Sequence, residues 1–122
     1  RSMNPDPIVF PLANPIAEIS REDALTAGAA IVGTGSSKFP NQINNLLVFP
    51  GIFRGALDVR ASDINVAMMK AASEAIAACV PAGELGSAMI IPSPFDPTVH
   101  KNVAAAVRAA AVKSGVARIA CD

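Results

Sequence analysis

The chain has 122 residues, of which 52% are hydrophobic and 16% are charged, and ten basic residues balance ten acidic ones. This length favours one compact unit, and zero net charge excludes the basic surface that binds nucleic acid or an anionic membrane. No apolar run approaches the roughly 18 residues of a membrane-spanning helix. The apolar excess therefore predicts a buried sheet, a subunit interface, or a surface that further chain covers.

The first third of the chain predicts a strand, a short helix and a second strand. An apolar run at residues 8–13 favours a buried strand, and Pro11 predicts that it ends early or bulges, because proline cannot donate to the sheet. Ser20 is expected to cap a helix over residues 22–27, and residues 30–32 predict the second strand. This order predicts a parallel βαβ unit with a right-handed crossover.

Both predicted strands end in polar, turn-forming residues. Asn14 and Pro15 follow the first strand, and residues 33–37 (GTGSS) follow the second. In open α/β sheets, ligands bind beyond the carboxyl ends of the strands. Two polar loops should therefore lie side by side at a binding edge.

The rest of the chain is predicted to be mainly helical. We expect helices from residue 51 to 58, from Ser62-Asp63 to about 80, and from a cap at Asp96 or Thr98 to about 114. Residues 81–86 are expected to turn, and residues 89–91 to form a strand or an extended connection. Two apolar stripes should face the core: Ile64, Met68, Ala71, Ala75 and Cys79 on the second helix, and Val99, Val103, Val107 and Ala110 on the third.

Few side chains could carry acid–base or metal chemistry. The sequence has no GxGxxG-type turn, no cluster of metal-ligating residues and no Ser-His-Asp set. His100, the single histidine, is expected to be a surface or capping residue. Arg54 could bind an anion, but the pattern favours a surface pair with Asp58, which is worth about 0.2–0.5 kcal/mol.

The two cysteines, Cys79 and Cys121, form neither a disulfide framework nor a metal-ligand spacing. A reducing cytoplasm is the compartment that this usage favours. Cys79 stands in an apolar predicted helix, where we expect it to act as a small buried hydrophobe. The opening residues, RSMNPDP, lack the apolar segment of a signal peptide.

With acid–base, metal and cysteine chemistry set aside, the side-chain carboxamides are the remaining candidate binding groups. An amide offers donors and an acceptor without charge, which suits recognition of a nicotinamide carboxamide or of a substrate carboxylate and hydroxyl. It does not suit proton abstraction. Ordinary turn chemistry also explains any one of these residues alone. The residues concerned are Asn14, Asn41, Gln42, Asn44 and Asn45.

Four ordered motifs resemble the nicotinamide-binding domain of malic enzymes. They are residues 13–15 (ANP), 33–36 (GTGS), 39–45 (FPNQINN) and 49–58 (FPGIFRGALD), and residues 91–97 (IPSPFDP) are similar to a downstream segment of smaller, bacterial-type members. The resemblance extends from about Ile8 to Val116. It implies an incomplete α/β fold, part of a Rossmann-like parallel sheet with flanking helices, in which residues 1–122 are the carboxyl-terminal portion of the NAD(P)-binding domain.

The resemblance also implies roles for individual residues. Asn14 matches the asparagine that is expected to contact substrate and the nicotinamide side of the cofactor. Asn44 matches the residue expected to help bind malate and the nicotinamide ribose or carboxamide, with Asn45 as a lower-ranked cofactor contact. The backbone would approach the cofactor closely in the turn after the second strand, at Gly33, Thr34 and Gly35.

The activity implied is oxidative decarboxylation of malate to pyruvate and CO2, with NAD or NADP as cofactor and Mg²⁺ or Mn²⁺ as the metal. The family's catalytic tyrosine and lysine, its metal carboxylates and its glycine-rich phosphate loop precede the matched region, and this sequence contains no tyrosine. The chain is therefore expected to be inactive alone and to need the remainder of the enzyme chain, in a homo-oligomer. It departs from the family pattern at Lys38, where an acidic residue is expected.

Two alternatives stay open. A malolactic enzyme shares this domain and converts malate to lactate without net release of reduced cofactor. A non-catalytic assembly module would also have apolar, alanine-rich helices, because exposed apolar faces bind partners. The choice between NAD and NADP depends on residues near the ribose, which this sequence does not contain.

Overall fold

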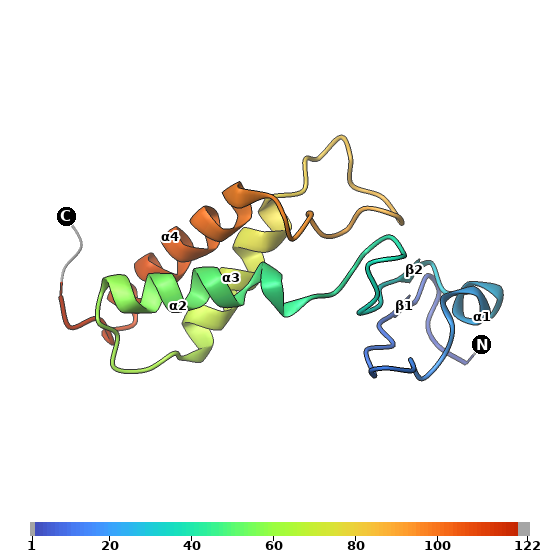
Figure 1. Ribbon diagram of the computed structural model, residues 1–122, viewed down its shortest axis with the longest axis horizontal. Coiled ribbons are helices and arrows are strands. Elements are labelled where there is room, and N and C mark those ends of the chain that lie inside the picture. The colour runs from blue at the N-terminus through green and yellow to red at the C-terminus, as the bar shows by residue number, and fades with distance from the viewer. Residues whose placement is uncertain (1, 120–122) are drawn as a thin grey trace. The chain divides into compact units, whose positions relative to one another are not determined.

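The computed structural model describes residues 2–119 (Figure 1). The chain divides into two compact units, one made of residues up to Asn44 together with Pro81–Ile91, the other of Asn45–Val80 and the residues from Pro92 onward. The prediction of one compact unit is therefore wrong. Residues 81–91 connect two helices of the second unit, but they belong to the first unit. Ser87 and Ile90 in this segment hydrogen-bond to the side chain of Asn41 there.

The first unit contains a two-stranded parallel sheet. Strand β1 (Ile8–Val9) pairs with β2 (Ile31–Val32) in the register Ile8 opposite Ile31, and helix α1 (Arg21–Thr26) connects them. The predicted βαβ order is confirmed, and β1 ends before Pro11, as expected. The handedness of the crossover stays a prediction.

Helix α1 begins where its cap was predicted. The Ser20 hydroxyl accepts a hydrogen bond from the backbone N–H of Asp23 at 3.0 Å, which satisfies one of the donors left free at a helix start. Ala24, on the inner face of α1, is only 3% exposed. Helix α1 therefore packs against β2 with a small, buried residue on its inner face.

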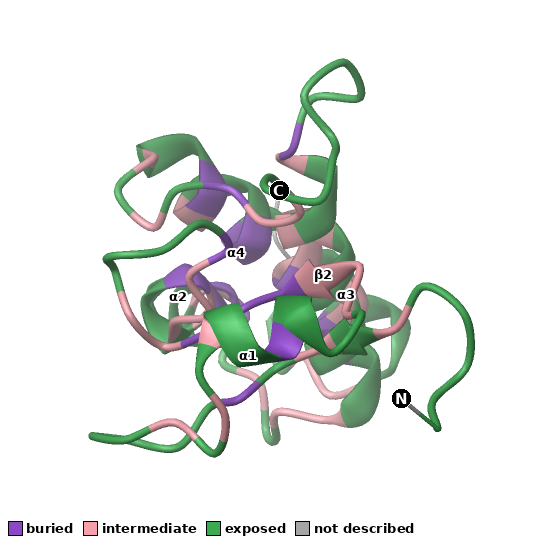
Figure 2. Cartoon of the chain, turned by 90° about the vertical axis from the view of Figure 1, so that its right-hand side faces the viewer, coloured by how far each residue is buried: buried purple, intermediate pink, exposed green. Residues whose placement is uncertain are grey.

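The second unit is helical. It contains a short 3₁₀ helix, η1 (Asn45–Leu47), and three α-helices, α2 (Phe49–Asp58), α3 (Val66–Ala78) and α4 (Pro97–Lys113). Helix α4 packs against both α2 and α3, and its inward positions are among the purple residues of Figure 2. The three valines of the predicted α4 stripe, Val99, Val103 and Val107, are fully buried. Ala111 is buried with them, whereas the predicted Ala110 is half-buried.

Helix α3 begins later than the sequence predicts. Its cap is Asn65, whose side-chain oxygen accepts from the N–H of Met68 at 3.1 Å. Ser62 instead donates its N–H to the carbonyl of Val116 at 2.9 Å and is held there. The buried residues of α3 are Met68 and Ala72. Ala71, Ala75 and Cys79, which were also predicted to face the core, are only half-buried.

Two further predictions concern the connections between the helices. Of the two alternatives for residues 89–91, the strand does not form, since Met89 makes only an isolated bridge to Gly86, and the connecting segment is what remains. Cys79 is the half-buried C-cap residue of α3 rather than a buried helix residue, and Cys121 lies outside the described residues. Among residues 2–119, no helix is both long and apolar enough to cross a membrane.

Helix α4 depends on its cap, and this gives a testable pH dependence. One carboxylate oxygen of Asp96 accepts from the hydroxyl of Thr98 at 2.7 Å and from its N–H at 2.9 Å. These bonds, the hydroxyl first, hold the pKa of Asp96 below its ordinary value of 3.8. Because the pKa is lowered on folding, the contribution is complete above that value and is lost as pH falls below it.

We therefore expect the stability difference between wild type and Asp96→Asn to shrink as the pH falls from roughly 5 to 3. Urea unfolding of both proteins across this range measures it. A difference that stays constant with pH would show that the Asp96 charge does not stabilise the start of α4.

Candidate functional site

The loop after β1 carries Asn14. Its peptide bond to Pro15 is cis, and the Asn14 side chain is exposed. The loop folds back so that the N–H of Ala13 donates to a carboxylate oxygen of Glu18 at 3.1 Å. This hydrogen bond is the largest cause of a lowered pKa at Glu18, so the carboxylate is ionised at neutral pH and braces the loop.

The loop after β2 contains Gly33, Thr34 and Gly35. Thr34 is 6% exposed, and its carbonyl accepts from the N–H of Ile43 at 2.8 Å. Its hydroxyl accepts from the N–H of Ser36 at 3.2 Å, which shapes the turn. This loop is therefore fixed by the segment that precedes Asn44.

The two loops meet at Asn14 and Gly35. A Cβ atom placed on Gly35 would lie 3.6 Å from both the Nδ2 and the Oδ1 atoms of Asn14. The prediction that two polar loops lie side by side beyond the strand ends is confirmed. Glycine leaves the backbone next to the exposed carboxamide uncovered, and any side chain larger than alanine at position 35 would occupy that space.

Gly33 has a different local role. A Cβ there would lie 3.0 Å from the carbonyl oxygen of Asn41 and equally close to the side chains of Ile43 and Phe10. Gly33 thus allows close packing inside the first unit. Its contact with a cofactor, and that of Thr34, stay predictions.

Asn41 is a structural residue that the sequence did not identify as such. It is 5% exposed and its φ is 57°, a left-handed conformation that asparagine tolerates. Its Nδ2 donates to the carbonyls of Ser87 at 2.7 Å and Val32 at 3.4 Å, and its Oδ1 accepts from the N–H of Ile90 at 3.0 Å. The carboxamide therefore hydrogen-bonds inside the protein through both its nitrogen and its oxygen, which favours the structural alternative over ligand recognition for this member of the carboxamide group.

The other carboxamides lie on the same segment. The side chain of Gln42 donates to the carbonyl of Gly35 at 3.4 Å, which ties this segment to the turn beside Asn14. Asn44 is half-buried and directly follows Ile43, which pairs with Thr34. Asn45 is exposed and begins η1, where the chain passes into the second unit.

The exposed part of this arrangement offers an uncharged group that can form hydrogen bonds. The carboxamide of Asn14 can both donate to and accept from an amide, and Gly35 beside it adds no bulk. Neither residue can transfer a proton at neutral pH. In the described part of the chain, no group of three or more His, Cys, Asp or Glu side chains could hold a metal ion.

Comparison with known proteins agrees with this arrangement. The family model for the NAD binding domain of malic enzyme matches residues 1–112. A bifunctional malic/malolactic enzyme from Bacillus subtilis is 59% identical over 100% of this chain, which spans 30% of that protein. An NAD-dependent malic enzyme from Geobacillus stearothermophilus is 52% identical over 97% of the chain and 24% of that protein.

Solved structures give the same result. The crystal structure of a malic enzyme from Pyrococcus horikoshii aligns with a TM-score of 0.93 and 57% identity, over 98% of this chain and 27% of that one. That of the Entamoeba histolytica malic enzyme aligns with a TM-score of 0.92 and 45% identity, over 98% and 24%. The predicted α/β class, part of a Rossmann-like sheet, is confirmed. With nearly its whole length matched, this chain belongs to the malic enzyme family and carries sequence of its NAD-binding domain.

Proposed function

We propose that this chain forms the wall that faces malate and the nicotinamide in an enzyme that oxidatively decarboxylates malate to pyruvate and CO2 with NAD or NADP. The observation that carries the proposal is that Asn14 and Gly35 lie close together after the carboxyl ends of the two parallel strands. That edge is where α/β sheets bind ligands. Membership of the malic enzyme family supports the choice of substrate and cofactor.

The roles of the side chains follow from their chemistry. The carboxamides of Asn14 and Asn44 would orient the malate and the nicotinamide by hydrogen bonds. The cofactor, when bound, accepts the hydride. Proton transfer and binding of Mg²⁺ or Mn²⁺ are assigned to other parts of the enzyme, and residues 1–122 to the carboxyl-terminal portion of the NAD(P)-binding domain.

An exposed apolar stripe along η1 and α2 supports the need for further protein around this chain. We define it as the side chains of Leu46, Phe49, Phe53 and Leu57, which are 51%, 48%, 52% and 73% exposed. The two phenylalanine rings stack with centroids 5.7 Å apart. Exposed apolar surface of this kind favours burial against protein, which fits the remainder of the enzyme chain or a second copy in a homo-oligomer.

Substitution of Asn44 tests the proposal. In the intact enzyme, Asn44→Ala should lower kcat/KM for malate by more than about tenfold, or roughly 1.4 kcal/mol of transition-state binding, because a hydrogen bond to the reacting ligands is lost. Asn102→Ala, at an exposed position of α4, is the control and should leave kcat/KM unchanged. Equal values for Asn44→Ala and wild type would remove Asn44 from the site.

A malolactic activity is the second candidate, because one relative carries the name bifunctional malic/malolactic enzyme. Product analysis with the intact enzyme and malate distinguishes the two. Pyruvate with one equivalent of reduced cofactor supports the malic reaction, whereas lactate without net cofactor reduction supports the malolactic one.

A further inference from the structure

Helices α2 and α4 cross at very short distance. A Cβ on Gly51 would lie 2.7 Å from the Cβ of Val103, and a Cβ on Gly55 would lie 2.5 Å from the backbone oxygen of Ala104. Glycine at these two positions therefore allows the helix backbones to touch. Because the two helices are closely packed here, side chains that project from both of them beside the crossing have fixed positions at their Cα atoms.

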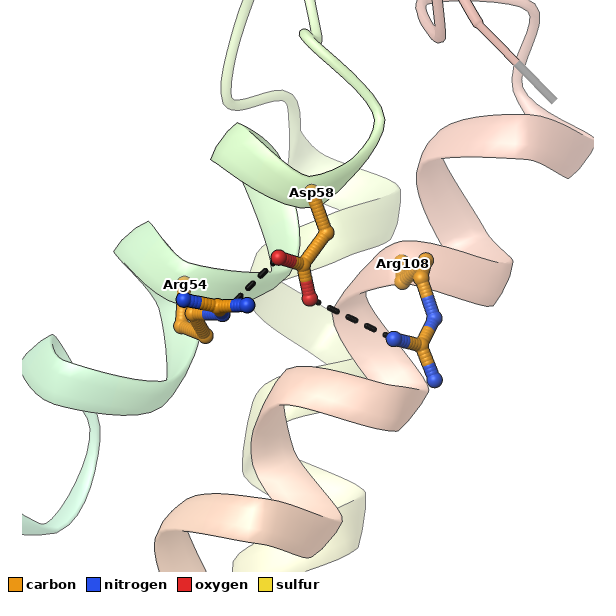
Figure 3. A network of polar contacts seen from close by, with 3 residues as sticks. All are labelled: Arg54, Asp58 and Arg108. Carbon is orange, nitrogen blue, oxygen red and sulfur yellow. Dashed lines mark hydrogen bonds and ion pairs between the residues drawn. The ribbon is translucent and has the colours of Figure 1, made fainter. Parts of the chain in front are cut away.

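Three of those side chains form an ion-pair network (Figure 3). The Nε atom of Arg54 lies 2.8 Å from Oδ1 of Asp58, and Nη1 of Arg108 lies 3.3 Å from Oδ2 of the same carboxylate. The surface pair predicted between Arg54 and Asp58 is confirmed, and α4 adds a second guanidinium to it. The Asp58 side chain is 18% exposed, against 74% for Arg54 and 39% for Arg108, so the arginines are the groups open to solvent.

A pocket of about 440 Å³ lies beside this network, entirely within the second unit. Its lining carries the positive charges of Arg54, Arg108 and Lys101 against the single negative charge of Asp58. The pocket therefore has a net charge of +2 with the histidine neutral. The small side chain of Ala104 also lines it and leaves it open.

His100 also lines the pocket and supplies a second observation. It lies in the first turn of α4, half-buried, and does not cap the helix, so its predicted surface or capping role is only partly met. Its Nδ1 atom is buried and has no hydrogen-bond partner in the protein. Buried polar atoms are normally satisfied, so a residue that lines the pocket carries a polar atom without a partner in the protein.

We propose that this α2–α4 pocket binds a phosphate dianion, either free or as the terminal group of a phosphomonoester. A phosphate carries a charge of about −1.5 to −2 at neutral pH, which matches the net charge of the lining. Asp58 pairs with one nitrogen of each guanidinium. Each planar guanidinium has further N–H donors that can bind an anion. Asp58 is therefore a positioning residue that holds both arginines beside the pocket.

A purely structural ion pair explains this arrangement less well than an anion-binding pocket does. Exposed pairs stabilise proteins by only about 0–1 kcal/mol, and Asp58 already has Arg54 four residues before it. Neither Arg108 nor Lys101 is needed to neutralise that single carboxylate. The surplus of positive charge is what an anion would use.

Calorimetric titration of the intact enzyme tests the proposal. The enzyme is first saturated with its nicotinamide cofactor, so that phosphate groups of the cofactor occupy their own site, and ionic strength is kept constant because salt screens surface charges. Inorganic phosphate and methyl phosphate are titrated separately. We expect saturable binding of inorganic phosphate, with methyl phosphate binding as well if the physiological ligand is a phosphomonoester.

Three variants locate the binding. Lys101→Gln and Arg108→Gln should each weaken it by about tenfold, and Lys70→Gln, at an exposed position of α3 paired with Glu74 at 3.8 Å, should leave it unchanged. Arg108 pairs with Asp58 across the α2–α4 crossing, and Lys101 lines the same pocket, so Lys101→Gln keeps the test valid if Arg108→Gln does not fold. Absence of saturable binding, or equal binding in wild type and Lys101→Gln, would overturn the proposal, and neither result depends on malate turnover.

Discussion

Gly55→Ala should lower the free energy of unfolding of the helical unit by about 1–2 kcal/mol, the overpacking cost less the helix-propensity gain of alanine. The added Cβ would lie 2.5 Å from the backbone oxygen of Ala104 and 2.9 Å from the Cβ of Val107. Neither atom belongs to a flexible side-chain end, so α2 and α4 have to move apart, and overpacking of this kind costs about 1–3 kcal/mol. The substitution should destabilise even though alanine favours a helix over glycine by about 1 kcal/mol.

Gly83→Ala is the matched control for this experiment. A Cβ at position 83 would meet nothing within 4 Å, so the same chemical change should alter stability by less than about 0.5 kcal/mol. Chemical unfolding followed by circular dichroism measures both variants. If Gly55→Ala were as stable as wild type, the close crossing of α2 and α4, and with it the base of the α2–α4 pocket, would be wrong.

Asn41→Ala should destabilise the first unit by about 2 kcal/mol. The substitution removes three hydrogen bonds of a side chain that is only 5% exposed, to Ile90, Ser87 and Val32, each worth about 0.5–1.5 kcal/mol. Alanine also tolerates the φ of 57° at this position less well than asparagine. The connection of residues 81–91 to the first unit should loosen most.

Hydrogen exchange at the amide of Ile90 reports this local effect directly. We expect faster exchange in Asn41→Ala than in wild type, while Asn102→Ala, whose Nδ2 reaches only the sulfur of Cys79 at 3.5 Å, should exchange like wild type. Unchanged exchange at Ile90 in both variants would mean that Asn41 does not hold this segment.

Local interactions explain why several elements were predictable from the sequence. Ser20 and Asp96 cap their helices through residues two or three positions away, and such short-range bonds leave a recognisable pattern. The start of α3 was not predictable in this way. Ser62 and Asn65 are both good capping residues, and the choice between them is decided by Val116, which holds Ser62 from 54 residues away.

The candidate site shows the same division. Parallel topology is enough to bring the loops of Asn14 and Gly35 to one edge, and the sequence predicts that topology. The role of Asn41 depends on partners 46 and 49 residues further along the chain, for which no local pattern exists. Likewise the pair of Arg54 with Asp58 follows from helical spacing, whereas Arg108 joins it from 50 residues away.

The central claim is that Asn14 and Asn44 face malate and the nicotinamide. A crystal structure of the intact enzyme with its cofactor and an unreactive analogue of malate tests this most directly. We expect both carboxamides to lie within about 3.2 Å of polar atoms of the analogue or of the nicotinamide end of the cofactor. Both side chains lying beyond about 3.5 Å from either ligand, with no bridging water, would contradict it.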